Sequence, residues 1–204
     1  MCYHTKQTKS LRKVEHRFKA KVERPEIFNS NAIYNGFIFP KTPVILNSSP
    51  SEIKEISWGL IPSWSKDESI RQYTLNAKIE TLTEKPSFKN CINNRCIVIV
   101  DGFFEWKWLD TAGKKKQKYL IQLERGVLFS FAGLYSEWTD MSSGEIITTY
   151  TLVTTEANEL MSEIHNQKKR MPVVLTEQNE SDWLEGADIS IFKKPEIKLL
   201  AEKI

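Results

Sequence analysis

The chain has 204 residues, of which 40% are hydrophobic and 27% charged, and its formal net charge is +3. This length and composition are typical of one globular domain over residues 1–204 and exclude an intrinsically disordered chain. No apolar run approaches the roughly 20 residues of a membrane-spanning helix, and no secretory signal is present, so we expect a cytoplasmic protein.

Near the N-terminus, apolar residues recur at helical spacing at Leu11, Val14, Phe18 and Val22. The spacing predicts an amphipathic helix from Leu11 to Lys21. The segment over residues 2–24 contains eight Lys or Arg against two Glu. Such a charge fits either a phosphate-binding face or an ordinary solvated surface, and both interpretations stay open.

The middle of the chain has the strongest strand pattern. Short strands are predicted at Pro43–Leu46 and from Ser57 toward a proline-marked turn before Trp64. Four strand segments then follow one another: Arg95–Asp101, Phe103–Leu109, Lys118–Leu123 and Val127–Tyr135. The sequence DTAGKKKQ, between the second and third of these segments, predicts a long basic hairpin tip.

The C-terminal part returns to mixed structure. After a strand at Ile146–Thr154, helical spacing predicts a helix with Thr155 as its N-cap and His165 at its end. A strand at Met171–Leu175 and a short helix at Glu180–Leu184 follow. The apolar face of the first helix consists of Ala157, Leu160, Met161 and Ile164. The predicted fold is α+β, a single monomeric domain dominated by an antiparallel, barrel-like β-sheet with a few flanking helices.

The cysteines argue against a disulfide framework and against a zinc site. Cys2, Cys91 and Cys96 form an odd set without C-x-x-C spacing. Cys96 lies in the apolar run RCIVIV and is predicted to be a small buried hydrophobe. Nothing else in the sequence requires a metal ion or an organic cofactor, and none is expected.

Cys2 has distinctive chemistry if Met1 is removed. An N-terminal α-amine has a pKa of about 7.7–8.0, so a useful fraction is a neutral nucleophile at physiological pH. Attack on an aldehyde gives a Schiff base, and the neighbouring thiol closes on the same carbon to give a five-membered thiazolidine. In an arbitrary protein, however, a cysteine at position 2 carries no such meaning.

Three further side chains have both a chemical and a structural interpretation. Glu105 lies among aromatic residues, where burial would raise its pKa into the range of a general acid or base, or it lies on the solvated face of an edge strand. His165 either transfers protons, with its protonated form favoured by the helix end, or simply caps helix carbonyls. Asn76 either orients a substrate or caps a turn.

Taken together, several segments resemble the SRAP (SOS response-associated peptidase) family of abasic-site processing proteins. The resemblance extends from Cys2 to Trp183 and depends on the order of its motifs more than on any single one. The motifs are Cys2 after Met1, WGLIPSW, NAKIET, RCIVIVDGFFEW, AGLYSEW and IHNQKKRMPVVL.

The resemblance implies a sensor of abasic sites in single-stranded DNA that acts in the DNA damage response and joins the nucleoid when bound. In this family the N-terminal cysteine traps the ring-opened sugar as a thiazolidine DNA–protein crosslink. By resemblance, Cys2 is the nucleophile, Asn76 holds the N-terminus and the sugar, and Glu105 shuttles protons. His165 assists ring opening, Schiff-base formation and crosslink reversal.

The resemblance also implies DNA contacts. Trp64 corresponds to an aromatic platform for the bases, and Arg170 to a phosphate-binding arginine. Lys78 stands where the family usually has an arginine, which keeps the charge but loses the bidentate fork. His4 follows Tyr3 in place of the usual Gly-Arg, and we retain it as a DNA contact.

One insertion separates this chain from the commoner family pattern. Residues Gln167, Lys168 and Lys169 lie between the His165 and Arg170 ends of a motif that is usually more compact, and they predict a bulged basic loop.

Two other functions remain open. A cysteine peptidase or amidase, acting on its own N-terminus or on other chains, would use Cys2, His165 and Glu105 as nucleophile, base and orienting group. A non-catalytic single-stranded-DNA-binding module would use only the basic and aromatic side chains.

Overall fold

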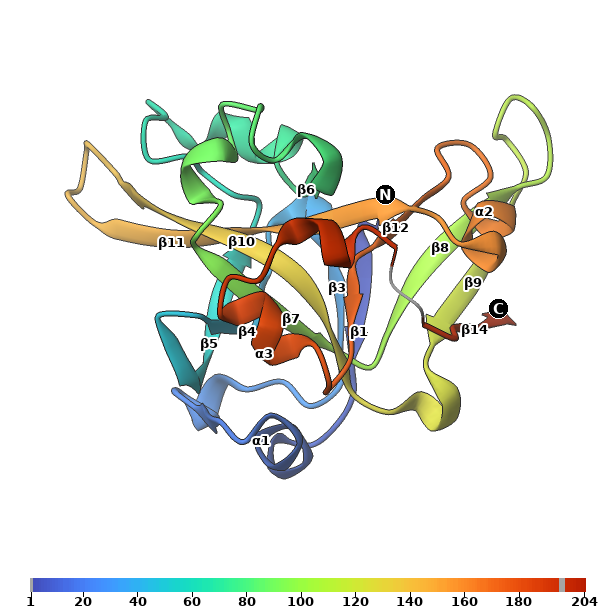
Figure 1. The fold of residues 1–204 in the computed structure, drawn as a ribbon, viewed down its shortest axis with the longest axis horizontal. Coiled ribbons are helices and arrows are strands. Elements are labelled where there is room, and N and C mark those ends of the chain that lie inside the picture. Colours follow the sequence, from blue (N-terminus) through green and yellow to red (C-terminus); the bar gives the residue numbers. More distant parts are fainter. Residues whose placement is uncertain (1, 195–196) are drawn as a thin grey trace.

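A computed structural model describes residues 2–194 and 197–204 (Figure 1). The fold is mostly β, with short helices at the periphery. The helices are α1 (Leu11–Phe18), α2 (Glu159–Ile164) and α3 (Glu180–Leu184). The strands are β1 (His4–Gln7), β2 (Lys21–Val22), β3 (Ala32–Asn35), β4 (Lys41–Leu46), β5 (Ser49–Trp58), β6 (Asn76–Lys78), β7 (Arg95–Val100), β8 (Gly102–Trp108), β9 (Lys116–Gln122), β10 (Phe129–Thr139), β11 (Ile146–Glu156), β12 (Arg170–Pro172), β13 (Val174–Leu175) and β14 (Leu200–Lys203).

Five of the strands form a closed ring. Antiparallel pairing follows the order β11–β10–β7–β4–β5. Strand β5 then returns to β11 in parallel, with Ser57 opposite Thr149 and Trp58 opposite Tyr150. A second, five-stranded sheet has the order β14–β9–β8–β1–β3. The predicted α+β fold with a barrel-like, largely antiparallel sheet is therefore confirmed.

Strand β7 explains how one chain builds two cores. Its residues are all buried, and side chains alternate between the faces of a strand. Cys96 and Val98 join a cluster that contains Phe103 of the second sheet. Ile97 and Ile99, on the other face, join a cluster beneath α1 and α3. The prediction that Cys96 is a small buried hydrophobe is confirmed. The five consecutive apolar residues at positions 96–100 are typical of a strand covered on both faces.

The close packing around Cys96 also requires a glycine at position 133 on the neighbouring strand β10. A Cβ atom at Gly133 on β10 would lie 2.8 Å from the Cys96 sulfur and 2.9 Å from the Thr151 carbonyl oxygen. Because one of these neighbours is backbone, only glycine fits between β7 and β11 at this position.

Two predicted boundaries are wrong. The N-terminal helix ends at Phe18 because Lys19 turns left-handed, and Val22 lies on strand β2 instead of the helix. The N-cap of α2 is Asn158, whose Oδ1 accepts from Met161 N at 2.9 Å, whereas Thr155 lies inside β11. In the first case an apolar residue of the following strand shares the helical spacing by coincidence, and in the second the side-chain hydrogen bond of Asn158 determines the cap.

Most of the remaining predicted elements are present. The strand expected from Ser57 is only the end of β5, and the single strand expected at Met171–Leu175 is divided into β12, which pairs with β11, and β13, which pairs with β10. The helix after β11 gives way to a turn at His165, and Glu180–Leu184 forms α3 as expected. Hydrogen bonding to neighbouring strands extends the central strands beyond their apolar segments. The short strands β3, β6 and β14 also exist through such pairing, because their sequences show no clear alternation of apolar and polar residues. No helix in the described part of the chain is both long and apolar enough to cross a membrane.

Candidate active site and nucleic-acid interface

Cys2 lies two residues before the start of β1 and is fully buried in the core cluster that also contains Trp58 and Phe103. Its thiol donates a hydrogen bond to the His4 carbonyl oxygen, with an S–O distance of 3.6 Å. Burial, with a further contribution from the charge of Glu105, raises the pKa of the Cys2 thiol far above its usual range. The sulfur is therefore a protonated thiol at neutral pH.

Asn76 links Cys2 to the barrel. It begins β6, which pairs in parallel with β11 opposite Leu152. Its Nδ2 donates to the Cys2 carbonyl oxygen at 2.9 Å, while its Oδ1 is buried with no hydrogen-bond partner. The preceding residue, Leu75, accepts a 2.8 Å hydrogen bond from the Trp58 indole. Trp58 thus positions the strand end from which Asn76 reaches Cys2.

Glu105 lies on β8, which is an internal strand. Strand β1 pairs with it on one side, with His4 opposite Phe104, and β9 pairs on the other, with Tyr119 opposite Glu105. The side chain is 5% exposed, and burial raises its pKa to about 7. The solvated edge-strand interpretation is therefore wrong. A carboxyl group that titrates near neutrality both gives and takes protons readily.

His165 lies in the turn that follows α2. Its Nδ1 is 2.9 Å from the Arg170 carbonyl oxygen and 3.1 Å from the Arg170 amide nitrogen, so one tautomer donates to the oxygen and the other accepts from the amide. Burial lowers the pKa of His165 to about 4. The expectation that the helix end favours imidazolium is wrong, because a six-residue helix compensates little of the cost of burying the charge.

The residue after His165 was missed by sequence reasoning. Asn166 Oδ1 accepts from the Trp108 amide at 3.2 Å, and its Nδ2 donates to the Trp108 carbonyl at 2.9 Å. Trp108 ends β8, the strand that carries Glu105. The Asn166 amide therefore ties the turn of His165 to the strand of Glu105, a pairing that an asparagine after a helix does not reveal by itself.

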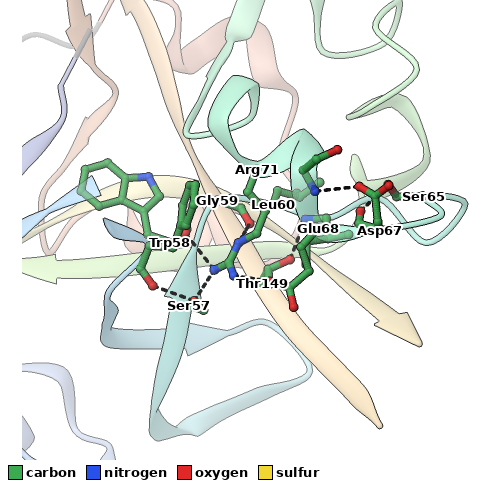
Figure 2. Close-up of polar contacts among 12 residues, drawn as sticks. Ser57, Trp58, Gly59, Leu60, Ser65, Asp67, Glu68, Arg71 and Thr149 are labelled. Atoms are coloured by element: carbon green, nitrogen blue, oxygen red, sulfur yellow. Dashed lines mark hydrogen bonds and ion pairs between the residues drawn. The ribbon is translucent and has the colours of Figure 1, made fainter. Parts of the chain in front are cut away.

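The loop that carries Trp64 is held by a buried arginine, Arg71 (Figure 2). Its Nε donates to the Gly59 carbonyl and its Nη2 to the Trp58 carbonyl, both at 3.3 Å, and Nη2 also donates to the Ser57 hydroxyl. Nη1 forms an ion pair with Glu68 at 2.8 Å. A single guanidinium thus joins the end of β5 to the 3₁₀ helix at Glu68–Tyr73.

Further contacts fix the same loop. The Arg71 guanidinium lies 4.5 Å from the centre of the Phe39 ring, and a Cβ atom at Gly59, where φ is +106°, would lie 2.9 Å from that ring. Ile61 N donates to the Thr149 hydroxyl at 2.8 Å on β11. On this anchored base, Trp64 remains 52% exposed, as an aromatic stacking platform requires.

Basic side chains converge beside β6 and β12. Lys78, Lys168, Lys169 and Arg170 line a cavity of about 490 Å³, together with Glu156. The inserted residues Gln167, Lys168 and Lys169 are exposed in the turn before β12, as predicted for a basic loop. The cavity concentrates positive charge next to the His165 turn.

Two predicted DNA contacts have other partners in this structure. The Arg170 guanidinium is buried and pairs with both carboxylate oxygens of Glu80, at 2.8 and 2.9 Å, and donates to the Thr154 carbonyl at 2.7 Å. The His4 ring packs edge-on against Trp106, with ring centres 4.9 Å apart, and burial lowers its pKa. His4 is therefore neutral at neutral pH and brings no positive charge.

A family model described as SOS response associated peptidase (SRAP) matches residues 1–201. The chain belongs to the SRAP family. This confirms the resemblance drawn from the ordered motifs, and the match extends past Trp183, beyond the last of them.

Named SRAP relatives and solved structures agree with this membership. The chain is 46% identical over 142 residues to abasic site processing protein YoqW of Bacillus subtilis, covering 69% of this chain and 61% of YoqW. It is 31% identical over 182 residues to abasic site processing protein HMCES of Gallus gallus, covering 78% of this chain and 52% of HMCES. A crystal structure of a Bacteroides thetaiotaomicron protein matches with a TM-score of 0.90 and 35% identity, over 100% of this chain and 92% of that one. The chain thus spans only part of the length of these curated relatives.

Proposed function

We propose that this SRAP protein processes abasic sites in single-stranded DNA by forming a thiazolidine crosslink through Cys2 once Met1 has been removed. The names of the relatives support the abasic-site part of the proposal. The contact that carries the chemistry is the 2.9 Å hydrogen bond from Asn76 to the Cys2 carbonyl oxygen, because it holds the reacting end of the chain beside Glu105.

In the first step, the neutral α-amine of Cys2 adds to the aldehyde carbon of the ring-opened sugar. Loss of one water gives the imine, and this dehydration needs a proton on the departing oxygen. Glu105, with a pKa of about 7, supplies that proton and then takes one back from nitrogen.

In the second step, the thiol adds across the imine double bond. Sulfur bonds to carbon and a proton goes to nitrogen, so the step is neutral overall and closes the five-membered ring. Burial keeps the Cys2 sulfur protonated, which prevents it from competing with the amine for the aldehyde in the first step. Asn76 Oδ1, which is buried without a partner, is available to accept a hydrogen bond from a sugar hydroxyl.

His165 is neutral at physiological pH because its pKa is about 4. In this proposal it acts as a base on the sugar hydroxyl during ring opening, and as the acid for the reverse reaction after accepting that proton. For DNA binding, Trp64 stacks on a base, while Lys78, Lys168 and Lys169 contact the phosphates. Arg170 lines the same cavity from its ion pair with Glu80.

A cysteine peptidase is less well supported. A peptidase thiol attacks as a thiolate and is activated by a lowered pKa or a neighbouring base. Here burial instead raises the pKa of the Cys2 thiol.

The test uses protein shown by mass spectrometry to begin with Cys2, incubated with single-stranded DNA that contains one abasic site. We expect a denaturation-resistant adduct whose mass is the sum of both molecules minus one water. Cys2→Ala should abolish the adduct but retain affinity for intact single strands, whereas Cys91→Ala, a matched change at another buried cysteine, should leave adduct formation unchanged.

Absence of any adduct with the wild-type protein would refute the proposal. An adduct that persists in Cys2→Ala would also count against it. Peptide hydrolysis that requires the Cys2 thiol but tolerates a blocked α-amine would favour the peptidase instead.

A further inference from the structure

A second cavity lies at the end of the molecule opposite the candidate site. It has a volume of about 570 Å³ between α1, the loop after β9 and the loop between β13 and α3. In Figure 1, α1 lies at the lower edge of the view, whereas β6 and β12, which border the candidate site, lie in the upper half. A ligand in this cavity would leave the candidate site open.

The wall formed by α1 carries a row of positive charges. Lys13 and Arg17 are four residues apart on one face of the helix, and Lys9 comes just before the helix begins. Side chains at this spacing lie about 5–6 Å apart. The row is also preorganised: the Arg17 guanidinium is held by both oxygens of Glu180, at 2.9 and 3.0 Å.

A fourth cation faces this row from the opposite wall. Arg125 lies in the loop after β9 with φ of +59°, a left-handed conformation that few residues other than glycine adopt, and Gly126 continues it with φ of +56°. These two residues turn the loop so that both line the cavity. The Nζ atom of Lys9 would lie 3.8 Å from a Cβ atom placed at Gly126, so the two walls approach each other there.

The surface between the cations is aliphatic. Leu123, Val127 and Leu128 line it, and Val127 is 48% exposed although it is apolar. Phe129 also lies at this wall but is fully buried, so no aromatic ring face is offered for base stacking. Glu177 is the one carboxylate among the described lining residues, and its Oε2 lies 3.9 Å from Arg17 Nε.

We propose that this cavity binds an acidic peptide segment that carries one bulky apolar side chain. Side chains on one side of an extended peptide recur about every 6.6 Å, close to the spacing of the cations on α1. The peptide carboxylates then pair with Lys13 and Arg125, and the apolar side chain covers Val127. Lys9 adds positive charge nearby, but its Nζ already lies 3.6 Å from Asp101 Oδ2. The absence of a stacking surface favours a peptide over single-stranded DNA.

The binding experiment uses the full chain and a fluorescein-labelled peptide of about eight residues, made of Asp and Glu around one central Phe. We expect saturable anisotropy that weakens at least tenfold when the Phe is replaced by Ser. Lys13→Glu with Arg125→Glu should weaken binding at least tenfold, and so should Val127→Asp. The matched charge reversal Lys168→Glu with Lys169→Glu should change it less than twofold.

Thermal melting first shows that the variants are folded, and Val127→Ser replaces Val127→Asp if the Asp variant does not fold. Four outcomes would then overturn the peptide proposal. Failure to saturate up to about 1 mM peptide, or equal binding of the Ser peptide, overturns the proposal. Equal loss in the Lys168/Lys169 variant means non-specific charge attraction and also overturns it. An intact oligothymidylate could also displace the peptide. If Lys13→Glu with Arg125→Glu weakens the binding of that oligonucleotide as well, the occupant is nucleic acid and the peptide proposal is overturned.

Discussion

Glu105 shows how far a single residue can be predicted from sequence. In the run FFEWKWL, the period-2 alternation of side chains puts Glu105 on the same face as Phe103, and both are buried. Whether that face met solvent depended on pairing with β1 and β9, which join β8 from different parts of the chain. Local pattern therefore predicted the side of the strand, but only long-range pairing determined the environment of the carboxyl group.

The raised pKa of Glu105 predicts a pH-dependent cost to stability. An ordinary Glu has a pKa near 4.5, whereas burial raises that of Glu105 to about 7. The folded state then binds more protons than the unfolded state between these values, so stability is fully present below pH 4.5 and is lost as pH rises through 7. The loss attributable to Glu105 is on the order of 2–3 kcal/mol.

The variant Glu105→Gln isolates this contribution. Other groups also change the stability of the wild-type protein with pH. The lowered pKa of His165 makes stability rise between pH 4 and 6.5, whereas Glu55, whose pKa burial also raises to about 7, makes it fall as Glu105 does. These other contributions cancel when Glu105→Gln is compared with wild type. The variant should therefore gain stability relative to wild type as the pH rises from 4.5 to 7.5. Urea denaturation measures it, with exposed Glu145→Gln as the control; a difference that is constant with pH would contradict the burial argument.

At the scale of elements, all three α-helices were predicted, and so were the strongly apolar strands. For these strands and for α1 and α2, burial of one face imposes a regular spacing on the apolar residues. The errors came where two elements follow each other without a break in that period, as at Val22, and where a cap is chosen by geometry, as at Asn158. The short strand β6, which positions Asn76, was not predictable, because three residues carry no period and parallel pairing with β11 creates the strand.

Arg71 is an element-scale feature that sequence motifs did not reveal, and its removal should loosen the Trp64 loop. Arg71→Met keeps the unbranched apolar stem of the side chain but leaves the Ser57 hydroxyl and the Trp58 and Gly59 carbonyls without their donor. Hydrogen bonds from charged groups contribute about 1.5–3 kcal/mol each. Because Glu68 is half exposed and regains water, we expect a net loss of roughly 2–3 kcal/mol in unfolding free energy.

The same variant should also weaken binding of single-stranded DNA if the loop presents Trp64 as a stacking platform. Urea denaturation and fluorescence anisotropy measure the two effects, with Trp64→Ala as the reference for complete loss of the platform. Lys66→Met, which removes an exposed charge from the same loop, is the matched control. Unchanged stability and affinity in Arg71→Met would show that neither the loop nor Trp64 depends on this arginine.

At the scale of the whole molecule, positive charge is divided between two ends. The net charge of +3 says little about this division. Three of the eight basic residues in the N-terminal segment lie on α1, away from the candidate site (Figure 1). Lys168 and Lys169, in contrast, line the cavity next to the His165 turn. The fold thus separates two basic clusters that sequence alone could not rank.

This division predicts which lysines determine the salt dependence of DNA binding. Each phosphate contact on a single strand contributes about 0.7 to the slope of log affinity against log salt concentration. Lys168→Gln with Lys169→Gln should therefore lower the magnitude of that slope by about 0.7–1.4 and weaken binding most at low salt. Arg12→Gln with Lys13→Gln removes the same charge from α1 and should leave the slope within error of wild type, because these residues lie at the other end of the molecule.

Anisotropy titrations with an intact oligothymidylate at several salt concentrations measure both slopes. Equal reductions in the two variants would mean that DNA responds only to the net charge, and a reduction confined to the α1 variant would place the strand on the opposite end of the barrel.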